Sequence, residues 1–146
     1  MKSFSTSALI DALPETIWAI LTDGSQWPAW NPTVIKVEGT IALGEQITVL
    51  AKVNPDQGFA LTVSEFVPSE SMVWSSAMPL GLFKGERTYQ LTKQPDGMVE
   101  FAMQEVFSGL LSPLITRSIT RSIPDLQPSF DEFAAALKKR AEEPLP

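Results

Sequence analysis

Arg87, Tyr89 and Glu105 are the residues of this sequence whose types and spacing could do chemistry together. They lie on two strand-like segments, 87–92 and 99–107, that flank a Pro-Asp-Gly turn. If residues 95–97 form a three-residue loop, Arg87 faces Glu105 across the resulting hairpin. A guanidinium at that place would offer a fork of N–H donors to a carboxylate, a carbonyl or a phenolate.

The same register surrounds the two charges with apolar pairs. Tyr89 then pairs with Met103 and Leu91 with Phe101, and all six side chains share one face because alternate strand residues do. The other face collects polar residues, namely Glu86, Thr88, Gln90, Thr92, Glu100 and Gln104. A slip of one residue would set the apolar residues against polar partners, so the pattern favours this register. We therefore expect Arg87 and Glu105 within salt-bridge reach on the apolar, concave face.

Two interpretations of this charge pair remain open. Burying a charge without a partner costs roughly several kcal/mol even after the surrounding protein relaxes, so the two groups must pair with each other. They could form a structural ion pair near the end of the sheet, with access to solvent. They could also form a polar anchor at one side of an otherwise apolar pocket.

The composition excludes several other kinds of site. The chain has no cysteine and no histidine, which removes disulfides, thiolate or His-ligated metal sites, and nucleophiles that need a histidine base. We expect neither a metal nor a cofactor. The net charge of −6 argues against nucleic acid, and Lys138, Lys139 and Arg140 next to Glu142 and Glu143 are typical of a solvated helix end.

No segment has the apolar length of a membrane span, and the first residues lack the apolar run of a signal peptide. We therefore expect a cytoplasmic protein without stable membrane insertion. Its 146 residues suit a single domain, 1–146.

The elements that must position these residues follow from periodicity and turn signals. A strand over 3–11 precedes a helix over 14–23, where Pro14 and Glu15 suit the first turn and Gly24 ends the pattern. Further strands are predicted at 34–38, 47–53, 59–67, 72–78, 87–92 and 99–107. The strands are mostly consecutive, so we expect an antiparallel sheet of about seven strands in an α+β domain.

The C-terminal part changes to a helical period. Phe130, Phe133, Ala134 and Leu137 recur at helical spacing, and Ser129 with Glu132 resembles a capping box, which predicts a helix over 129–142. A second helix is predicted over about 112–122. Pro124 and Pro128 predict a kink or a non-helical gap between about 122 and 129.

The stretch SQWPAWNP, residues 25–32, holds two of the four tryptophans in a segment too rich in proline for an ordinary helix or strand. A single helical turn would project Trp27 and Trp30 to one side. We expect Trp27 in the core and Trp30 either in the core or at a cavity wall, while Asn31 caps or turns the chain. Trp74 shares a strand face with Met72.

Four stretches together resemble a known superfamily: LPETIWAILTDGSQWPAWNPTV (13–34), MVWSS (72–76), GERTYQL (85–91) and EVFSGLLSPLI (105–115). They are similar to the SRPBCC superfamily of START-like and birch-allergen-like proteins, in its polyketide cyclase/dehydrase-type branch. The resemblance implies a helix-grip fold, in which a curved sheet wraps around the C-terminal helix and encloses an apolar cavity. The sequence departs from the pattern at Pro124 and Pro128, and at Arg87, where relatives often carry histidine.

The resemblance also implies a set of cavity-lining residues, most of which spacing alone would place in a filled core. The expected set is Trp30, Trp74, Met78, Phe83, Arg87, Tyr89, Phe101, Met103, Glu105, Phe107, Leu111, Phe130 and Phe133.

Two functions follow as expectations. The first is binding or transport of a small hydrophobic molecule, such as a lipid, an aromatic or a polyketide-like compound, by a monomer or a homodimer. The second is a cofactor-independent cyclase or dehydratase, which needs a proton acceptor beside an enolisable carbon and a donor for the oxygen. In that case Glu105 would act as base, Tyr89 as acid and Arg87 at the oxyanion. The lack of a nucleophile–base pair favours the first.

Overall fold

One antiparallel sheet organises the chain. The computed structural model describes residues 2–52, 55–56, 58–77, 84–108 and 125–143. Within these ranges the sheet has the strand order β1-β7-β6-β5-β4-β3-β2. The strands are β1 (Lys2–Ile10), β2 (Val34–Glu38), β3 (Gln46–Ala51), β4 (Phe59–Val67), β5 (Ser71–Ala77), β6 (Lys84–Lys93) and β7 (Val99–Ser108). From β2 onward each strand pairs with the next along the chain, as predicted from their consecutive order.

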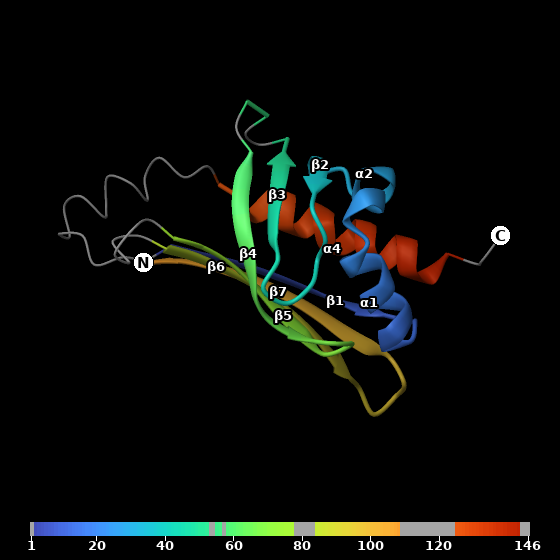
Figure 1. Cartoon of the computed structure of the whole chain (residues 1–146). Helices are drawn as coiled ribbons and strands as arrows, with labels where there is room; N and C mark the ends of the chain where they lie inside the picture. Colours follow the sequence, from blue (N-terminus) through green and yellow to red (C-terminus); the bar gives the residue numbers. More distant parts are fainter. Residues whose placement is uncertain (1, 53–54, 57, 78–83, 109–124, 144–146) are drawn as a thin grey trace.

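The helices lie on the concave side of this sheet. They are α1 (Pro14–Thr22), the short 3-10 turn η1 (Gly24–Gln26), α2 (Trp27–Trp30) and the long C-terminal α4 (Gln127–Glu142). Figure 1 shows the sheet curling around α4, with β1, β7 and β6 running beneath the helix and β2, β3 and β4 rising in front of it. The helix therefore lies inside the curl of the sheet, in the position that the resemblance implies.

The core forms where the apolar face of α4 meets the sheet. The buried residues of this helix recur at helical spacing: Phe130, Phe133, Ala134, Leu137 and Ala141. Burying one Phe or Leu side chain contributes about 1.5–3 kcal/mol. Docking of this stripe therefore holds α4 in the curled sheet.

The hairpin of β6 and β7 has the predicted register. Arg87 pairs with Glu105, Tyr89 with Met103 and Leu91 with Phe101. The turn closes as expected, since the Gln94 N–H donates to the Met98 carbonyl (2.7 Å). The prediction from polar and apolar alternation is confirmed.

The C-terminal helix predicted over about 129–142 is present and begins two residues earlier. The helix begins at Gln127, and Pro128 lies in its first turn, where the missing proline N–H costs no hydrogen bond. Ser129 makes no capping bond; instead the Asp125 carboxylate accepts the Gln127 N–H (3.0 Å). The expected gap is described only at residues 125 and 126, which are not helical. The helix predicted over 112–122 and Pro124 lie outside the described residues.

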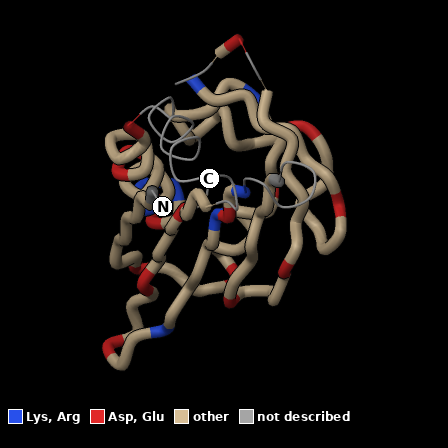
Figure 2. Tube along the Cα trace, turned by 90° about the vertical axis from the view of Figure 1, so that its left-hand side faces the viewer, with Lys and Arg blue, Asp and Glu red and all other residues tan. Residues whose placement is uncertain are grey.

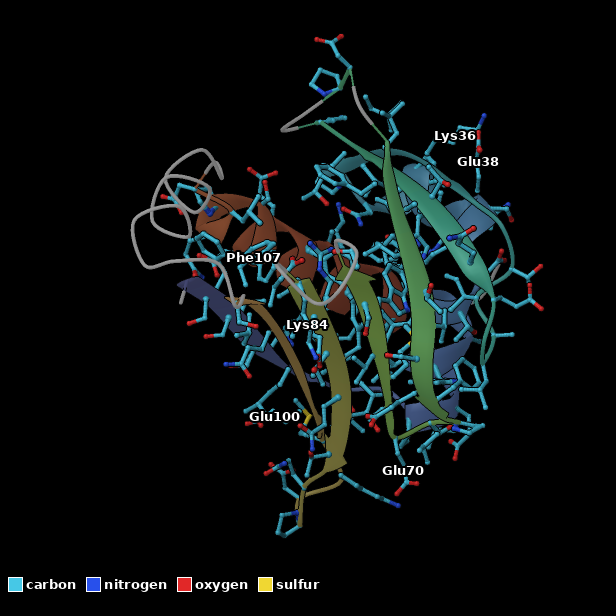
Figure 3. All side chains as sticks on the ribbon, turned by 60° about the vertical axis from the view of Figure 1, so that its left-hand side comes forward. Lys36, Glu38, Glu70, Lys84, Glu100 and Phe107 are labelled. Carbon is cyan, nitrogen blue, oxygen red and sulfur yellow. The ribbon has the colours of Figure 1, made fainter. Side chains whose placement is uncertain are left out.

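The charges of the described residues are scattered along the chain (Figure 2). Lys and Arg residues do not gather into a stripe in the part of the chain that this view describes. Several ion pairs lie on the outer surface, and Lys36 with Glu38 on β2 is one that points away from α4 (2.6 Å; Figure 3).

Candidate ligand-binding site

Arg87 and Glu105 form an ion pair on the concave face of the sheet. The Arg87 Nε–H and Nη2–H groups both donate to Oε2 of Glu105, at 3.0 Å and 2.6 Å. The side chains are 21% and 10% exposed, so the pair is largely removed from water. The guanidinium also lies 5.0 Å from the centre of the Phe130 ring on α4, a cation–π contact that fixes it under the first turn of the helix.

The surroundings keep Arg87 charged and Tyr89 neutral. Burial alone would lower the pKa of the Arg87 guanidinium, but the charge of Glu105 and the neighbouring Tyr89 outweigh this and raise it above its ordinary value. Burial raises the pKa of Tyr89 to about 12, and Arg87 offsets that effect only in part. At neutral pH the Tyr89 hydroxyl is therefore a protonated hydrogen-bond donor.

An aromatic cluster continues the site from the ion pair towards α2. The Tyr89 ring lies 4.8 Å from Trp74 and 6.0 Å from Phe133, measured between ring centroids. Trp27 stacks on Trp74 at 5.4 Å and meets Phe133 edge-on at 5.2 Å. Phe133 also contacts Trp30 at 5.5 Å, so this ring of α4 connects the sheet to the short helix α2.

Four buried polar atoms in this region find no hydrogen-bond partner among the described residues. They are Nε1 of Trp30, Nδ2 of Asn31, Nε1 of Trp74 and the Tyr89 hydroxyl. Leaving one buried donor unsatisfied costs roughly 1–3 kcal/mol, and native proteins keep such groups rare. By contrast, Nε1 of Trp27 donates to the Leu21 carbonyl (3.2 Å). The indole N–H groups of the cluster therefore differ: that of Trp27 is satisfied, whereas those of Trp30 and Trp74 are not.

Most of the residues predicted from the sequence lie on this concave face or on the face of α4 that packs against it. Those that are buried are Trp74, Tyr89, Phe101 and Met103 on the sheet and Phe130 and Phe133 on α4. Trp30 and Phe107 are partly buried against the core, and Figure 3 shows Phe107 on the side of the sheet that faces α4. The structure thus brings these residues together with Arg87 and Glu105. Met78, Phe83 and Leu111 lie outside the described residues.

Sequence reasoning missed three features of the site. Asn31 does cap the chain, since its Oδ1 accepts the Thr33 N–H (2.9 Å), but its amide nitrogen is also buried without a partner. Phe4 on β1 contacts the rings of Phe107 and Phe130 at 6.5 Å and 6.0 Å. Gly85 leaves room beside Phe107, whose ring would lie 3.1 Å from an added Cβ. Of these three features, only the position of Phe4 could have been predicted from the sequence, because Phe4 lies in a strand whose side chains alternate between the two faces of the sheet.

The acidic side chains of the described residues form no cluster of three or more that could hold a metal ion. A groove of about 390 Å³ lies on the outer face of β1, β6 and β7, lined mainly by polar residues such as Ser5, Thr88, Gln90 and Gln104. It lies on the opposite side of the sheet from the ion pair, so we do not assign the site there.

A curled antiparallel sheet that grips a C-terminal helix, with a polar group on its concave face, defines the class of START-like helix-grip proteins. The chain belongs to the family described as "Polyketide cyclase / dehydrase and lipid transport", which it matches over residues 1–142. No curated protein matches the sequence.

Solved structures share the fold at low sequence identity. A START superfamily protein from Mycobacterium smegmatis has a TM-score of 0.66 at 17% identity, covering 96% of this chain and 97% of that one. The Zhui aromatase/cyclase from Streptomyces sp. R1128 has a TM-score of 0.69 at 12% identity, covering 97% and 93%. These similarities confirm the helix-grip fold.

The di-domain ARO/CYC BexL from the BE-7585A biosynthetic pathway has a TM-score of 0.70 at 16% identity. The match covers 97% of this chain but only 47% of BexL, so the chain spans about half of that protein.

Among the residues that the structure describes, no helix has the length and apolar character needed to cross a membrane.

Proposed function

We propose that this protein binds a small, mostly apolar molecule between the concave face of the sheet and α4, and that Arg87, Tyr89 and Trp74 hold one polar end of it. The observation that carries the proposal is the group of buried donors without acceptors beside the ion pair, on Tyr89 and Trp74. A ligand oxygen would satisfy them in a place that is otherwise lined by aromatic rings. The family, which includes lipid transport proteins, supports the same function.

Arg87 can serve as an anchor without giving up its partner. Its Nε and Nη2 donate to Glu105, and a guanidinium carries five N–H groups in all. Apart from the contact of the guanidinium with Tyr89, the N–H groups not used by Glu105 could donate to the oxygen of a ligand carbonyl or phenol. Glu105 then acts as a positioning residue, since it holds the guanidinium in place and compensates its charge.

Native mass spectrometry of the freshly purified protein tests the proposal. We expect the wild-type protein to carry an apolar molecule that solvent extraction releases. Tyr89→Phe and Arg87→Met should each reduce its occupancy at least about fivefold, because each removes a hydrogen bond from a buried site. Lys36→Met is the matched control, because it breaks an ion pair on the outer face of β2.

The occupancy in the control should equal that of the wild type. Equal occupancy in all four proteins would place the bound molecule elsewhere and contradict the proposed site. A wild-type protein that carries no molecule, and that also binds none of an added panel of apolar ketones and phenols, would contradict the function.

A second candidate function is a cyclase or dehydratase, as in the aromatase/cyclases that share the fold. The specific observation in its favour is that Arg87, Tyr89 and Glu105 lie side by side on the concave face. Tyr89, with a pKa of about 12, is neutral at pH 7 and could protonate an oxygen. Glu105 could accept a proton through Oε1, which makes no hydrogen bond with the described residues.

Glu105→Gln separates the two functions. In a binding protein, glutamine still accepts the Arg87 hydrogen bonds and the donors of Tyr89 and Trp74 stay in place, so ligand binding persists although the uncompensated charge of Arg87 lowers stability. In an enzyme, the same change removes the proton acceptor and abolishes conversion of a poly-β-ketone substrate while binding persists. If the wild-type protein converts the substrate and Glu105→Gln does not, the result favours the enzyme. If neither protein converts the substrate, the result favours the carrier.

A further inference from the structure

Asn31 carries a donor whose orientation is fixed by its neighbours. Asn31 is 1% exposed. Its Oδ1 accepts hydrogen bonds from the Thr33 N–H (2.9 Å) and the Thr33 hydroxyl (2.7 Å). A backbone N–H must meet an oxygen, so the amide cannot be turned around to satisfy its nitrogen. The Nδ2 group is therefore held in place, buried, and without an acceptor among the described residues.

Trp30 places a second donor of the same kind next to it in the chain. Its indole ring contacts Trp27 at 5.7 Å and Phe133 at 5.5 Å, which limits its rotation. Its Nε1 is buried and finds no acceptor in the described part of the chain, although the indole of Trp27, three residues earlier, does find one. Two consecutive residues at the end of α2 thus present unsatisfied neutral donors.

These donors are separate from the group at Arg87 but belong to the same cluster. Phe133 of α4 contacts both Trp30 and Tyr89, at 5.5 Å and 6.0 Å between ring centroids. One donor group therefore comes from the sheet and the other from α2, with a single ring between them.

We propose that Trp30 Nε1 and Asn31 Nδ2 form a second donor site that receives another oxygen of the same bound molecule. The inference rests on the proposed function and names the ligand class: a neutral, mainly apolar compound with carbonyl-type oxygens at two places. Trp30, Asn31, Trp74 and Tyr89 supply uncharged donors, and the charge of Arg87 is already matched by Glu105. A buried carboxylate would have no unpaired cation to compensate it, so a fatty-acid anion fits less well than a ketone or a quinone.

A series of probes with the same two-ring size tests this inference. Naphthalene carries no oxygen, 1-tetralone one carbonyl and 1,4-naphthoquinone two opposed carbonyls, while 1-naphthoate adds the charged alternative. The chain has no cysteine that the quinone could alkylate. Affinities come from isothermal titration calorimetry at pH 7 with the wild-type protein and its variants.

Two kinds of variant remove the donors. Asn31→Asp keeps an oxygen for Thr33 but replaces the amide nitrogen by a carboxyl oxygen, so Asn31→Leu, which adds no charge, is measured beside it. Trp30→Phe keeps a smaller aromatic ring without its N–H. Thr33→Val is the matched control, because it removes one hydrogen bond to the Asn31 oxygen and leaves the nitrogen untouched. We expect wild type and Thr33→Val to prefer the quinone over 1-tetralone by about tenfold, and the donor variants to lose that preference.

The outcomes separate the inference from the proposed function. If the probes bind but Asn31→Asp and Trp30→Phe keep the wild-type preference, or if 1-naphthoate binds best, this inference is overturned and the proposed function stands. An equal loss in Thr33→Val would assign the effect to the turn and would also overturn it. If the wild-type protein binds none of the probes, both proposals fail.

Proton NMR of the wild-type protein provides a measurement that does not depend on how the variants fold. Adding 1,4-naphthoquinone should move the Trp30 indole and Asn31 side-chain amide resonances downfield, whereas naphthalene should not. Resonances that respond equally to both compounds would contradict a hydrogen bond at this site.

Discussion

Removing the charge of Arg87 should destabilise the protein far more than removing an ordinary surface charge. Breaking a buried ion pair typically costs about 3–5 kcal/mol, whereas an exposed pair contributes about 0–1 kcal/mol. The exposures of Arg87 and Glu105, 21% and 10%, put this pair near the buried limit. Arg87→Met keeps an apolar stem over Phe130 but leaves Glu105 with an uncompensated charge. We expect it to lower the free energy of unfolding by about 3 kcal/mol.

The double variant Arg87→Met/Glu105→Leu should recover most of this loss. Replacing a buried pair by apolar side chains is often neutral or stabilising, because neither charge is then left without a partner. We therefore expect it to lie within about 1 kcal/mol of the wild type, at least about 2 kcal/mol better than the sum of the single variants. Urea unfolding at pH 7, followed by tryptophan fluorescence, measures this as a midpoint shift of about 1–2 M for Arg87→Met.

Lys36→Met, which removes a charge from the exposed pair with Glu38, should shift the midpoint by less than about 0.5 M and serves as the control. Single variants that each cost less than about 1 kcal/mol, with additive effects in the double variant, would refute the reasoning. In that case water reaches the pair, and it contributes no more than a surface ion pair does.

Three further predictions concern Tyr89, two glycines with positive φ, and Trp27. Tyr89 is the only tyrosine of the chain, so the tyrosinate absorbance of the folded protein should titrate near pH 12. Because tyrosine in the unfolded chain titrates near pH 10, the free energy of unfolding should fall by about 3 kcal/mol in all as the pH rises from 10 to 12, and Tyr89→Phe should lack this fall. Gly39→Ala should cost at least about 1 kcal/mol more in urea unfolding than Gly97→Ala, because both positions have positive φ but only at Gly39 would a Cβ meet a carbonyl, that of Gln46, at 2.8 Å. Trp27→Ala should lower the free energy of unfolding by about 3–5 kcal/mol, since this ring is fully buried against Trp74 and Phe133, and a loss below about 1 kcal/mol would contradict its place in the core.

The sheet could be predicted closely because its information is local. The strands at 34–38 and 59–67 match their predicted bounds, since alternation and flanking Gly or Pro are properties of neighbouring residues. The Arg87–Glu105 pair followed from one turn, Pro-Asp-Gly, and the alternation on either side of it. Once the hairpin register is known, the facing residues are determined.

Other features depend on contacts that alternation does not encode. The stacking of Trp27 on Trp74 joins residues far apart in the chain. Pro128 is compatible both with a break before a helix and with the first turn of one, and only the Asp125 carboxylate on the Gln127 N–H distinguishes them. The unsatisfied nitrogen of Asn31 could not be foreseen either, since a missing acceptor is a property of the whole surroundings.

The buried donors of Trp30, Trp74 and Tyr89 indicate a conflict between stability and binding. Phenylalanine at these places would keep an aromatic ring in the cluster around Phe133 without an unsatisfied polar atom. At roughly 1–3 kcal/mol each, the unsatisfied donors are comparable in sum with a good part of the usual stability of a domain, about 5–15 kcal/mol. Side chains that serve packing alone would not need their polar tips. Tyr89→Phe, which removes only the hydroxyl, should therefore raise or preserve the free energy of unfolding while it weakens ligand binding. If it weakens both together, the hydroxyl serves the fold, and the acceptor that satisfies it is water.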